Sequence, residues 1–331
     1  MNVAIVKLSS IGDVVHALPV AGALKRLRPG TRVTWVAEAR EATLLAGHPD
    51  VDDVIIADTR GWRRRVGIAM LHEVREVARG LRERSFDVVL DLQALLKSGV
   101  LTALTRAPRR IGFAAGWSRE RMSTVFMTER VRPPADARHV VEQYITLLVP
   151  LGITHPAVEF RLPVDAGADA HVEEFLTSAG IKPQDRLVLM NPGAGRPDKR
   201  WPVDRFREVA QRLSDEAGAR VVALWGPGEE DDARALVSSS AAGIVAPPTT
   251  LRELAALARR ARLVVAGDTG PLHIAAAVGT LCVGLYGPTS GVRNGPYGVR
   301  HRVLQSPDGR LGSISVDAVV TASTALLDAS A

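Results

Sequence analysis

Short apolar stretches alternate with longer amphipathic stretches through the first half of the chain. The short stretches are rich in β-branched residues and predict strands, whereas the longer ones repeat apolar residues at helical spacing. Strands are predicted over residues 3–7, 32–37, 53–57, 86–91 and 109–113, and helices over 14–28, 66–84, 97–105 and 137–152. Because these strands are apolar throughout, we expect a parallel sheet with helices on both faces.

The alternation restarts after a proline-rich, weakly patterned stretch at residues 154–165. Strands are then predicted over 186–190, 219–224, 243–245, 262–266 and 281–285, and helices over 204–217, 229–239, 251–260, 271–278 and 316–328. We therefore predict an α/β protein with two doubly wound domains, residues 1–160 and 161–331. The last helix packs either on its own domain or back on the first. Because ligands of such sheets bind beyond the carboxyl ends of the strands, we expect the site in a cleft between the domains.

The composition is that of a globular protein, with 46% hydrophobic and 24% charged residues. This excludes a chain that is mainly disordered, collagen-like or coiled coil. No apolar run approaches the roughly 18 residues that span a bilayer. The N-terminal stretch is typical of a first strand rather than a signal peptide, so we expect a cytoplasmic protein. The single cysteine, Cys282, excludes an internal disulfide and a cysteine-based zinc site.

The net charge of +6 favours anionic partners such as nucleotides, acidic lipids or nucleic acid. Nucleic acid is the least favoured of these, because only 4% of the residues are aromatic and no known binding motif occurs. Only five of the 42 basic residues are lysines. Three of them, Lys7, Lys97 and Lys199, lie in polar motifs. A compact ammonium differs from a forked guanidinium as an anion ligand, so this placement points to those motifs as functional.

The first motif, KLSSIGDVVH at residues 7–16, follows the first predicted strand and begins the first helix. Asp13 can cap that helix, or its carboxylate, ionised at neutral pH, can accept a proton from a substrate. The sequence leaves both interpretations open. The loop matches neither the GxGxxG pattern nor a Walker P-loop, which argues against nicotinamide binding and P-loop phosphoryl transfer.

The second and third motifs place polar groups after later strands. DLQALLKS at residues 91–98 carries Gln93 and Lys97, although an ordinary loop with an exposed lysine explains it equally well. NPGAGRPDKRWP at 191–202 has glycines that allow the backbone to approach a ligand closely. Lys199 adds positive charge where a helix N-terminus already attracts anions, so this segment suits a diphosphate. A glycine-rich turn that merely connects two elements is the alternative.

The fourth motif, GDTGPLH at residues 267–273, is the most specific. Pro271 suits the first turn of a helix, because a backbone N–H in that turn has no partner within the helix and proline therefore loses no hydrogen bond there. The amides of Thr269 and Gly270 would then point at an anion, and His273 would lie in the first helical turn.

Together the four motifs resemble those of the ADP-heptose lipopolysaccharide heptosyltransferases, glycosyltransferase family nine. The segments KLSSIGDVVHALP, DLQALLKS, PDKRWP and GDTGPLHIAAAVG occur in the family's order and spacing, and the first two are most similar to the type I enzymes. NPGAG at 191–195 departs from the type I form, which leaves type II or III enzymes and other nucleotide-sugar transferases as alternatives. The resemblance implies a GT-B fold and an inverting transfer of heptose from ADP-heptose to Kdo of lipid A, without a metal or other cofactor.

The resemblance also implies roles for particular residues. Asp13 would be the general base. The donor site would comprise Ala194, Gly195, Lys199, Glu229, Thr249, Asp268, Thr269, Gly270 and His273, with Glu230 as the alternative to Glu229. The acceptor site would comprise Ser10, Arg60, Arg63, Gln93, Lys97, Arg119 and Arg121. Because the acceptor is a lipid, the resemblance implies a peripheral protein at the inner face of the inner membrane.

Overall fold

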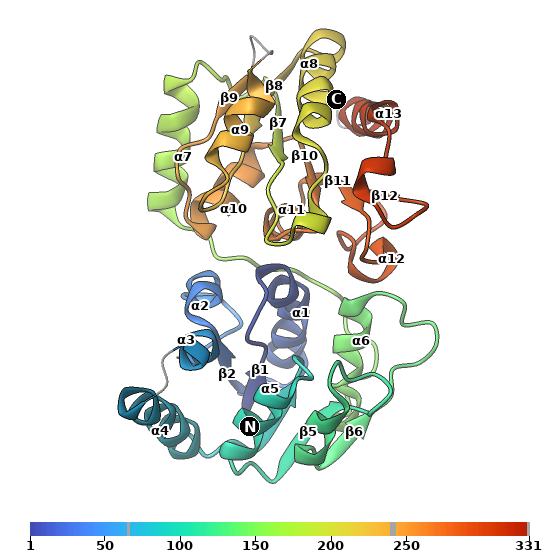
Figure 1. Cartoon of the computed structure of the whole chain (residues 1–331). Coiled ribbons are helices and arrows are strands. Elements are labelled where there is room, and N and C mark those ends of the chain that lie inside the picture. The colour runs from blue at the N-terminus through green and yellow to red at the C-terminus, as the bar shows by residue number, and fades with distance from the viewer. Residues whose placement is uncertain (65–66, 239–242, 330–331) are drawn as a thin grey trace. The chain divides into compact units, whose positions relative to one another are not determined.

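The computed structural model describes residues 1–64, 67–238 and 243–329, and the chain divides into two compact units (Figure 1). The first unit is Met1–Pro163 and the second is Val164–Ala331. The division falls within the proline-rich stretch, three residues beyond the predicted boundary at 160/161.

The first unit contains a six-stranded parallel sheet with the order β3-β2-β1-β4-β5-β6. Its strands are β1 (Asn2–Val6), β2 (Arg32–Ala37), β3 (Asp53–Ile56), β4 (Val88–Asp91), β5 (Arg109–Phe113) and β6 (Glu129–Val131). Its helices are α1 (Ile11–Leu27), α2 (Ala39–Leu45), α3 (Thr59–Arg64), α4 (Ile68–Glu83), α5 (Leu96–Leu104) and α6 (Val140–Thr146), with 3₁₀ turns η1 (Arg121–Phe126) and η2 (Val149–Leu151).

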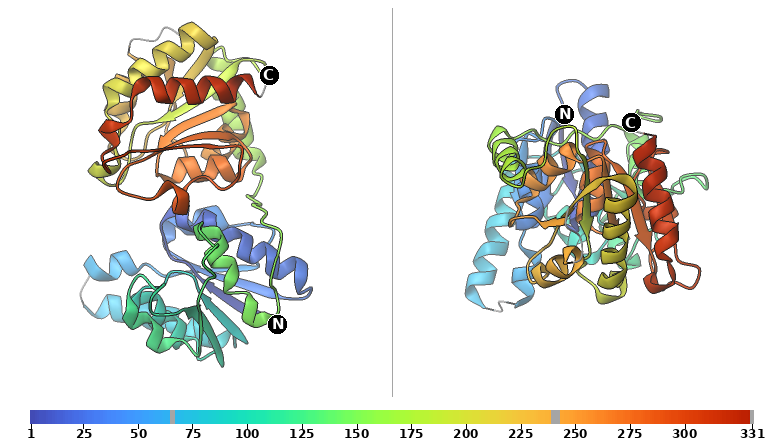
Figure 2. Two further views of the ribbon diagram at one scale, coloured as in Figure 1. Left: turned by 90° about the vertical axis from the view of Figure 1, so that its right-hand side faces the viewer. Right: turned by 90° about the horizontal axis from the view of Figure 1, so that it is seen from above.

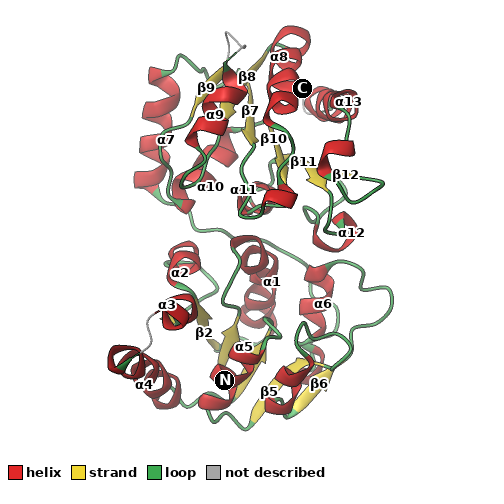
Figure 3. Cartoon of the chain, in the orientation of Figure 1, coloured by secondary structure: helices red, strands yellow, loops and turns green. Residues whose placement is uncertain are grey.

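Helices cover this sheet from both sides (Figure 3). Helices α1 and α6 pack against each other, and α4 packs against α5. Residues 3–6 of the central strand β1 have no exposed surface. Each such buried aliphatic side chain stabilises the fold by about 1.5–3 kcal/mol, which is why the apolar runs predicted the strands.

The second unit repeats this plan with the order β12-β11-β10-β7-β8-β9, again all parallel. Its strands are β7 (Arg186–Asn191), β8 (Ala219–Ala223), β9 (Gly243–Val245), β10 (Leu263–Gly267), β11 (Leu281–Tyr286) and β12 (Arg302–Gln305). Its helices are α7 (Ala166–Ser178), α8 (Val203–Ala217), α9 (Glu230–Val237), α10 (Leu251–Arg260), α11 (Gly270–Ala277), α12 (Gly291–Asn294) and α13 (Val316–Asp328), with 3₁₀ turns η3 (Pro197–Lys199) and η4 (Leu311–Ser313).

The last helix, α13, packs on the second unit. It lies beside α8 and contacts β10 and β11 (Figure 2). Its buried residues Val319, Val320, Leu326 and Leu327 belong to the same core as Phe206 of α8. The helix therefore closes the hydrophobic core of its own domain.

The two sheets share one topological feature that places the polar motifs. In each sheet the strand order reverses once, between β1 and β4 in the first unit and between β7 and β10 in the second. In doubly wound sheets the loops after the two strands at this switch point form the ligand site. The four motifs of the sequence follow β1, β4, β7 and β10, so each unit carries two motifs at its own switch point.

Candidate functional site

Asp13 lies in the first turn of α1 and uses its two carboxylate oxygens differently. Oδ2 accepts hydrogen bonds from the Ser10 backbone N–H at 3.1 Å and the Ser10 hydroxyl at 2.9 Å. Oδ1 faces the Lys7 ammonium at 3.4 Å, and 27% of the Asp13 side chain remains exposed. The capping interpretation is therefore correct for one oxygen, while the other meets a buried cation.

The Lys7 charge controls the ionisation of Asp13. Burial by itself would raise the pKa of this carboxyl. Lys7, the hydrogen bonds from Ser10 and the charge of Arg119 outweigh that effect and hold the pKa well below its usual value. Asp13 is therefore a carboxylate at neutral pH, the form that can take a proton from a hydroxyl.

The motif after β4 lies next to the first motif and is joined to it by hydrogen bonds. Asp91 is buried, accepting hydrogen bonds from the Gln93 and Ala94 N–H groups, both at 3.0 Å, and from the Ser98 hydroxyl at 2.9 Å. Gln93 is also buried, and its Oε1 accepts from the backbone N–H groups of Leu8 at 2.9 Å and Ser9 at 3.2 Å. The oxygen of Gln93, predicted to contact the acceptor, thus holds the first motif against the second.

Two predicted acceptor cations are paired with buried carboxylates. Lys97 Nζ lies 2.8 Å from the Thr59 hydroxyl and 3.3 Å from Glu38 Oε1, and Thr59 also donates to Glu38. Arg60 pairs with Glu41 at 3.4 Å. Both glutamates are only 2% exposed, whereas 25% of the Lys97 side chain and 47% of the Arg60 side chain are exposed. The carboxylates thus hold the two cations at the surface.

The remaining predicted acceptor residues are less tightly placed. Arg119 and Arg121 are exposed, and the charge of Arg119 acts on both Lys7 and Asp13. The side chain of Arg63 lies outside the part of the chain that the structure describes.

In the second unit, Asp268 is the centre of a polar cluster. Its Oδ2 lies 2.6 Å from Lys199 Nζ and accepts from the Thr289 hydroxyl at 2.9 Å, and its Oδ1 lies 3.1 Å from His273 Nε2. Burial would raise the pKa of Asp268, but His273 and Lys199 hold it well below its usual value. The carboxylate is therefore charged and orients both a lysine and a histidine beside the N-terminus of α11.

The two candidate glutamates, Glu229 and Glu230, have different surroundings. Glu229 is 14% exposed and accepts from Gly226 N–H at 3.1 Å and from Arg200 at 3.2 Å. It lies against Gly193, where an added Cβ would be 1.9 Å from Glu229 Oε2. Glu230 instead pairs with Arg234 along the surface of α9. Because Gly193 has no side chain, the Glu229 carboxylate has room to lie at the switch point.

The other predicted donor residues surround this cluster. Ala194 is buried and its carbonyl accepts from Arg200 at 3.0 Å, whereas an added Cβ at Gly195 would meet no atom within 4 Å. Thr269 and Gly270 begin α11, and the Thr269 hydroxyl donates to the Gly267 carbonyl at 3.2 Å. Thr249 is half-buried and directly precedes the N-cap of α10.

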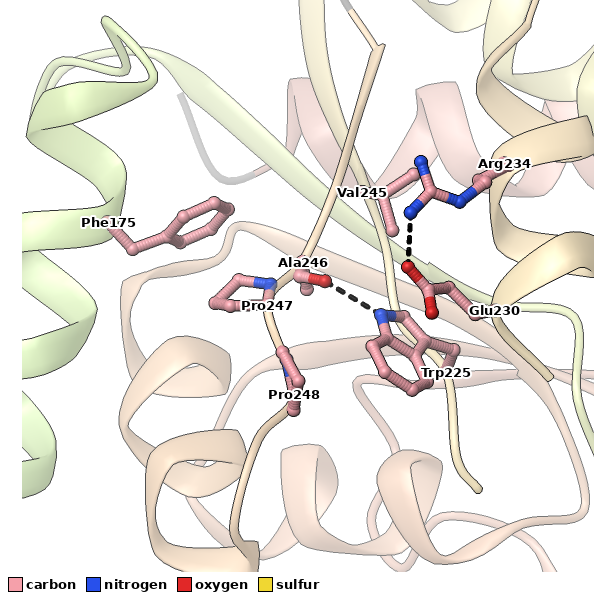
Figure 4. Close-up of a pocket in the computed structure, with 8 residues that line it drawn as sticks. All are labelled: Phe175, Trp225, Glu230, Arg234, Val245, Ala246, Pro247 and Pro248. Carbon is pink, nitrogen blue, oxygen red and sulfur yellow. Dashed lines mark hydrogen bonds and ion pairs between the residues drawn. The ribbon is translucent and has the colours of Figure 1, made fainter. Parts of the chain in front are cut away.

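A pocket of about 330 Å³ lies at the same carboxyl edge, beyond β8 and β9 (Figure 4). In Figure 4, Pro247 and Pro248 are seen between Phe175 on one side and Trp225 on the other, and the indole N–H of Trp225 donates to the Ala246 carbonyl at 2.7 Å. The lining residues are Phe175, Trp225, Glu230, Arg234, Val245, Ala246, Pro247 and Pro248. Its lining is apolar apart from the ion pair of Glu230 with Arg234, and it adjoins the loop that carries Glu229.

Several residues of these clusters were not predicted as site residues, among them Lys7, Glu38, Tyr144 and Thr289. Lys7 carried one signal, because it is one of only five lysines and begins the first motif. Tyr144 carried none, because its hydroxyl reaches Lys7 from 137 positions away in the sequence.

Two further searches concern metals and membranes. Among the residues that the structure describes, no three or more His, Cys, Asp or Glu side chains are grouped so that they could hold a metal ion. No helix in the described ranges is both long and apolar enough to cross a bilayer.

Comparisons with known proteins agree on one family. Residues 74–314 match the family model "Glycosyltransferase family 9 (heptosyltransferase)". Lipopolysaccharide heptosyltransferase 1 of Escherichia coli O18:K1:H7 is 32% identical over 96% of this chain and 96% of its own length. The enzyme of that name from Pseudomonas aeruginosa is 33% identical over 90% of this chain and 82% of its own length.

The fold comparison leads to the same proteins. A crystal structure of E. coli heptosyltransferase WaaC with ADP superposes with a TM-score of 0.82, covering 100% of both chains at 29% identity. The expected α/β fold with two doubly wound domains, of the GT-B type, is therefore confirmed.

Proposed function

The chain belongs to glycosyltransferase family 9, the heptosyltransferases, and from that premise we propose that it moves L-glycero-D-manno-heptose from ADP-heptose to Kdo of lipid A. Both curated relatives compared above are type 1 enzymes, and the first two motifs favour the same type. One observation supports the proposal above all others. An ionised carboxylate lies at the switch point of one unit, and a lysine with helix amides lies at the switch point of the other.

The first unit suits the acceptor. Asp13 Oδ1 would take the proton from the Kdo hydroxyl as that oxygen attacks the anomeric carbon. Kdo carries a carboxylate, and the half-buried Lys97 and the exposed Arg60, Arg119 and Arg121 provide charge of the opposite sign. Ser10 holds Oδ2 of the base, so the carboxylate keeps one orientation during the proton transfer.

The second unit suits the nucleotide sugar. Breaking the sugar–diphosphate bond builds negative charge on the departing ADP. An ammonium has three N–H donors, and Asp268 orients the Lys199 ammonium while engaging one of them. Lys199 and the first amides of α11 would stabilise the leaving diphosphate, and His273 would add a ring N–H or positive charge. These groups supply the charge stabilisation themselves, so we propose a reaction without a cofactor.

The pocket beyond β8 and β9 suits the adenine of the donor. A purine is flat and largely apolar on its faces, and the indole ring of Trp225 and the ring of Pro248, which both line this pocket, would pack against such a face (Figure 4). Along the carboxyl edge of the sheet, the loop that carries Glu229 lies between this pocket and the groups proposed to bind the diphosphate. A ribose would present its hydroxyls at this position.

The acceptor also suggests where the protein works. Lipid A is embedded in a bilayer, so a protein that transfers sugar to its Kdo must reach a membrane surface. We propose a cytoplasmic protein that attaches peripherally to the inner face of the inner membrane.

A transfer assay with purified acceptors tests this function. ADP-heptose is supplied with either Kdo-lipid A or the same acceptor already carrying one heptose. Transfer to Kdo-lipid A alone supports the type I assignment, and transfer to the heptosylated acceptor alone means a type II or III enzyme. If another nucleotide sugar is used and ADP-heptose is not, the donor assignment is wrong.

A further inference from the structure

Lys7 is buried deeper than any other lysine on the candidate site. It follows β1 and is 1% exposed, so its ammonium is removed from water almost completely. Burying an unpaired charge is strongly unfavourable, and a lysine in such a place normally loses its proton. An ammonium at this position therefore needs compensating partners.

The structure provides one acceptor for each of the three N–H donors. Nζ lies 2.7 Å from the Tyr144 hydroxyl, 3.4 Å from the Leu92 carbonyl and 3.4 Å from Asp13 Oδ1. The ammonium also lies 4.9 Å from the centre of the Tyr144 ring, within range of a cation–π interaction. Burial would lower the pKa of Lys7, but Asp13 and Tyr144 raise it above its usual value.

Because its three N–H donors are already hydrogen-bonded within the protein, the role open to Lys7 is limited. With all three donors engaged and almost no exposed surface, Lys7 has no group left to bind substrate. Its partner Asp13 is the one with exposed surface, 27% of its side chain. Any effect of Lys7 on the reaction must therefore pass through Asp13.

We propose that Lys7 is a positioning residue for the transfer reaction, whose ammonium, anchored by Tyr144 and Leu92, fixes the Asp13 carboxylate and keeps it ionised. The inference rests on the proposed role of Asp13 as the base. Tyr144 contributes twice, because its hydroxyl anchors Lys7 and also lies 3.5 Å from Asp13 Oδ1. Ser10 holds the opposite oxygen, so the carboxylate is restrained from both sides.

The neighbouring Asp91 shows what a carboxyl does here without such a cation in contact. It accepts three hydrogen bonds, yet burial raises its pKa to about 6. Lys7 acts on Asp91 only as a weaker, more distant charge. Hydrogen bonds alone therefore do not hold the pKa of a buried carboxyl below its usual value at this switch point, whereas Asp13, with an ammonium in contact, has a lowered pKa.

Other titratable groups surround this pair. Arg119, in the loop after β5, acts on both Lys7 and Asp13. His16, one turn further along α1, packs edge-to-face on His139 with ring centroids 5.3 Å apart. Asp91 titrates within the range of an activity assay, so the test must remove its contribution.

The test compares pH profiles of kcat/KM in an Asp91→Asn background, where that titration is absent. We expect Lys7→Met to lower kcat. The fall of kcat/KM at low pH, which reports protonation of Asp13, should move to a pH about one to three units higher, because an adjacent opposite charge usually lowers a carboxyl pKa by that much. Tyr144→Phe keeps the ring but loses the hydroxyl that holds Lys7. It should therefore move the low-pH fall of kcat/KM in the same direction, by a smaller amount. Lys25→Met is the matched control, because Lys25 pairs with Asp52 at the surface and its loss should leave the profile unchanged.

The results distinguish a failure of the inference about Lys7 from a failure of the proposed role of Asp13 as the base. If Lys7→Met and Tyr144→Phe reduce activity but their kcat/KM falls at the same low pH as that of the parent, Lys7 is only structural and the inference is wrong. If Asp13→Asn retains transfer, the proposed base itself is wrong, whatever Lys7 does. Should Lys7→Met fold poorly by circular dichroism, Tyr144→Phe decides the question alone.

Discussion

At the scale of residues, three ion pairs near the switch points each join a well-buried charged group to a more exposed one. Buried Lys7 holds half-exposed Asp13, buried Glu38 holds Lys97, and Asp268 holds Lys199. A buried ion keeps its charge only beside a partner, and the partner thereby loses freedom of movement. Each pair presents one oriented charged group at a switch point, as a transfer between charged substrates requires.

These pairs set the limit of prediction at this scale. The motifs identified Asp13, Lys97, Lys199 and Asp268, because each follows a strand in a polar run. The pairing of these residues was not predicted, since Glu38 is 59 positions from Lys97 and Asp268 is 69 from Lys199. Local sequence carries no record of such contacts. Asp268 thus pairs with Lys199 and His273, contacts that the motifs did not predict.

Asp91 provides a prediction about stability. Its pKa is raised to about 6, so the folded state binds more protons than the unfolded state between about pH 4 and 6. The free energy of unfolding should therefore fall as the pH rises through this window. The total is on the order of 3 kcal/mol, the value of a shift of about two pKa units. Asp91→Asn should lack this decline, measured by urea unfolding at pH 4 to 8, and an identical decline in the variant would contradict the account.

Gly193 provides a prediction about the donor site. An alanine methyl there would overlap Glu229 Oε2 and drive that carboxylate out of its place. The displaced carboxylate would lose its hydrogen bonds to the ribose, so we expect ADP to bind about tenfold more weakly by calorimetry, the value of roughly 1.4 kcal/mol. Gly312→Ala, at an exposed position in the same unit with no atom within 4 Å of the added methyl, is the control. Unchanged ADP affinity in Gly193→Ala would mean that Glu229 does not contribute to binding.

At the scale of elements, prediction succeeded where burial dominates. The strands at 32–37, 109–113 and 243–245 and the helices at 251–260 and 316–328 have the predicted bounds. The edge strands β6 and β12 were missed, because their residues, Glu-Arg-Val and Arg-Val-Leu-Gln, are mostly exposed and show no apolar run. Helix α7 was missed for a similar reason, since it buries only Ala168, Val172 and Leu176.

Proline explains the main error in element length. A single helix was predicted over 137–152, but α6 ends at Thr146 and a 3₁₀ turn follows at Val149–Leu151. Pro150 lies in that turn, and a proline cannot donate the hydrogen bond that continues an α-helix. The early end matters for the site, because α6 is the element that carries Tyr144 to Lys7.

The pocket beyond β8 and β9 allows a prediction that separates the base from the diphosphate. Trp225→Ala removes the aromatic wall, so ADP should bind about tenfold more weakly, given about 1–3 kcal/mol for stacking of one base. Ribose 5-diphosphate, which lacks the adenine, should bind the variant and the parent equally. Equal losses for both ligands would show that Trp225 supports the fold of the loop rather than the base.

At the scale of the whole molecule, the two units use one topology for two tasks. Both sheets have the same strand order and place two motifs at the switch point, yet the first presents a base and the second presents cations and helix amides. The sequence predicted this division, because the alternation of strands and helices restarts at the proline-rich stretch. It follows that proton removal and donor binding should be separable by mutation.

The central claim is tested most directly by measuring transfer and ADP affinity in the same two variants. Asp13→Ala should lower kcat by about 10²–10⁴-fold, the usual contribution of a general base, while ADP affinity stays within a few-fold of the parent. Lys199→Ala should weaken ADP binding by about 10- to 100-fold, because it removes a hydrogen bond to a charged group. If Asp13→Ala loses ADP affinity as strongly as it loses transfer, or if Lys199→Ala binds ADP normally, the assignment of base and donor site to separate domains is contradicted.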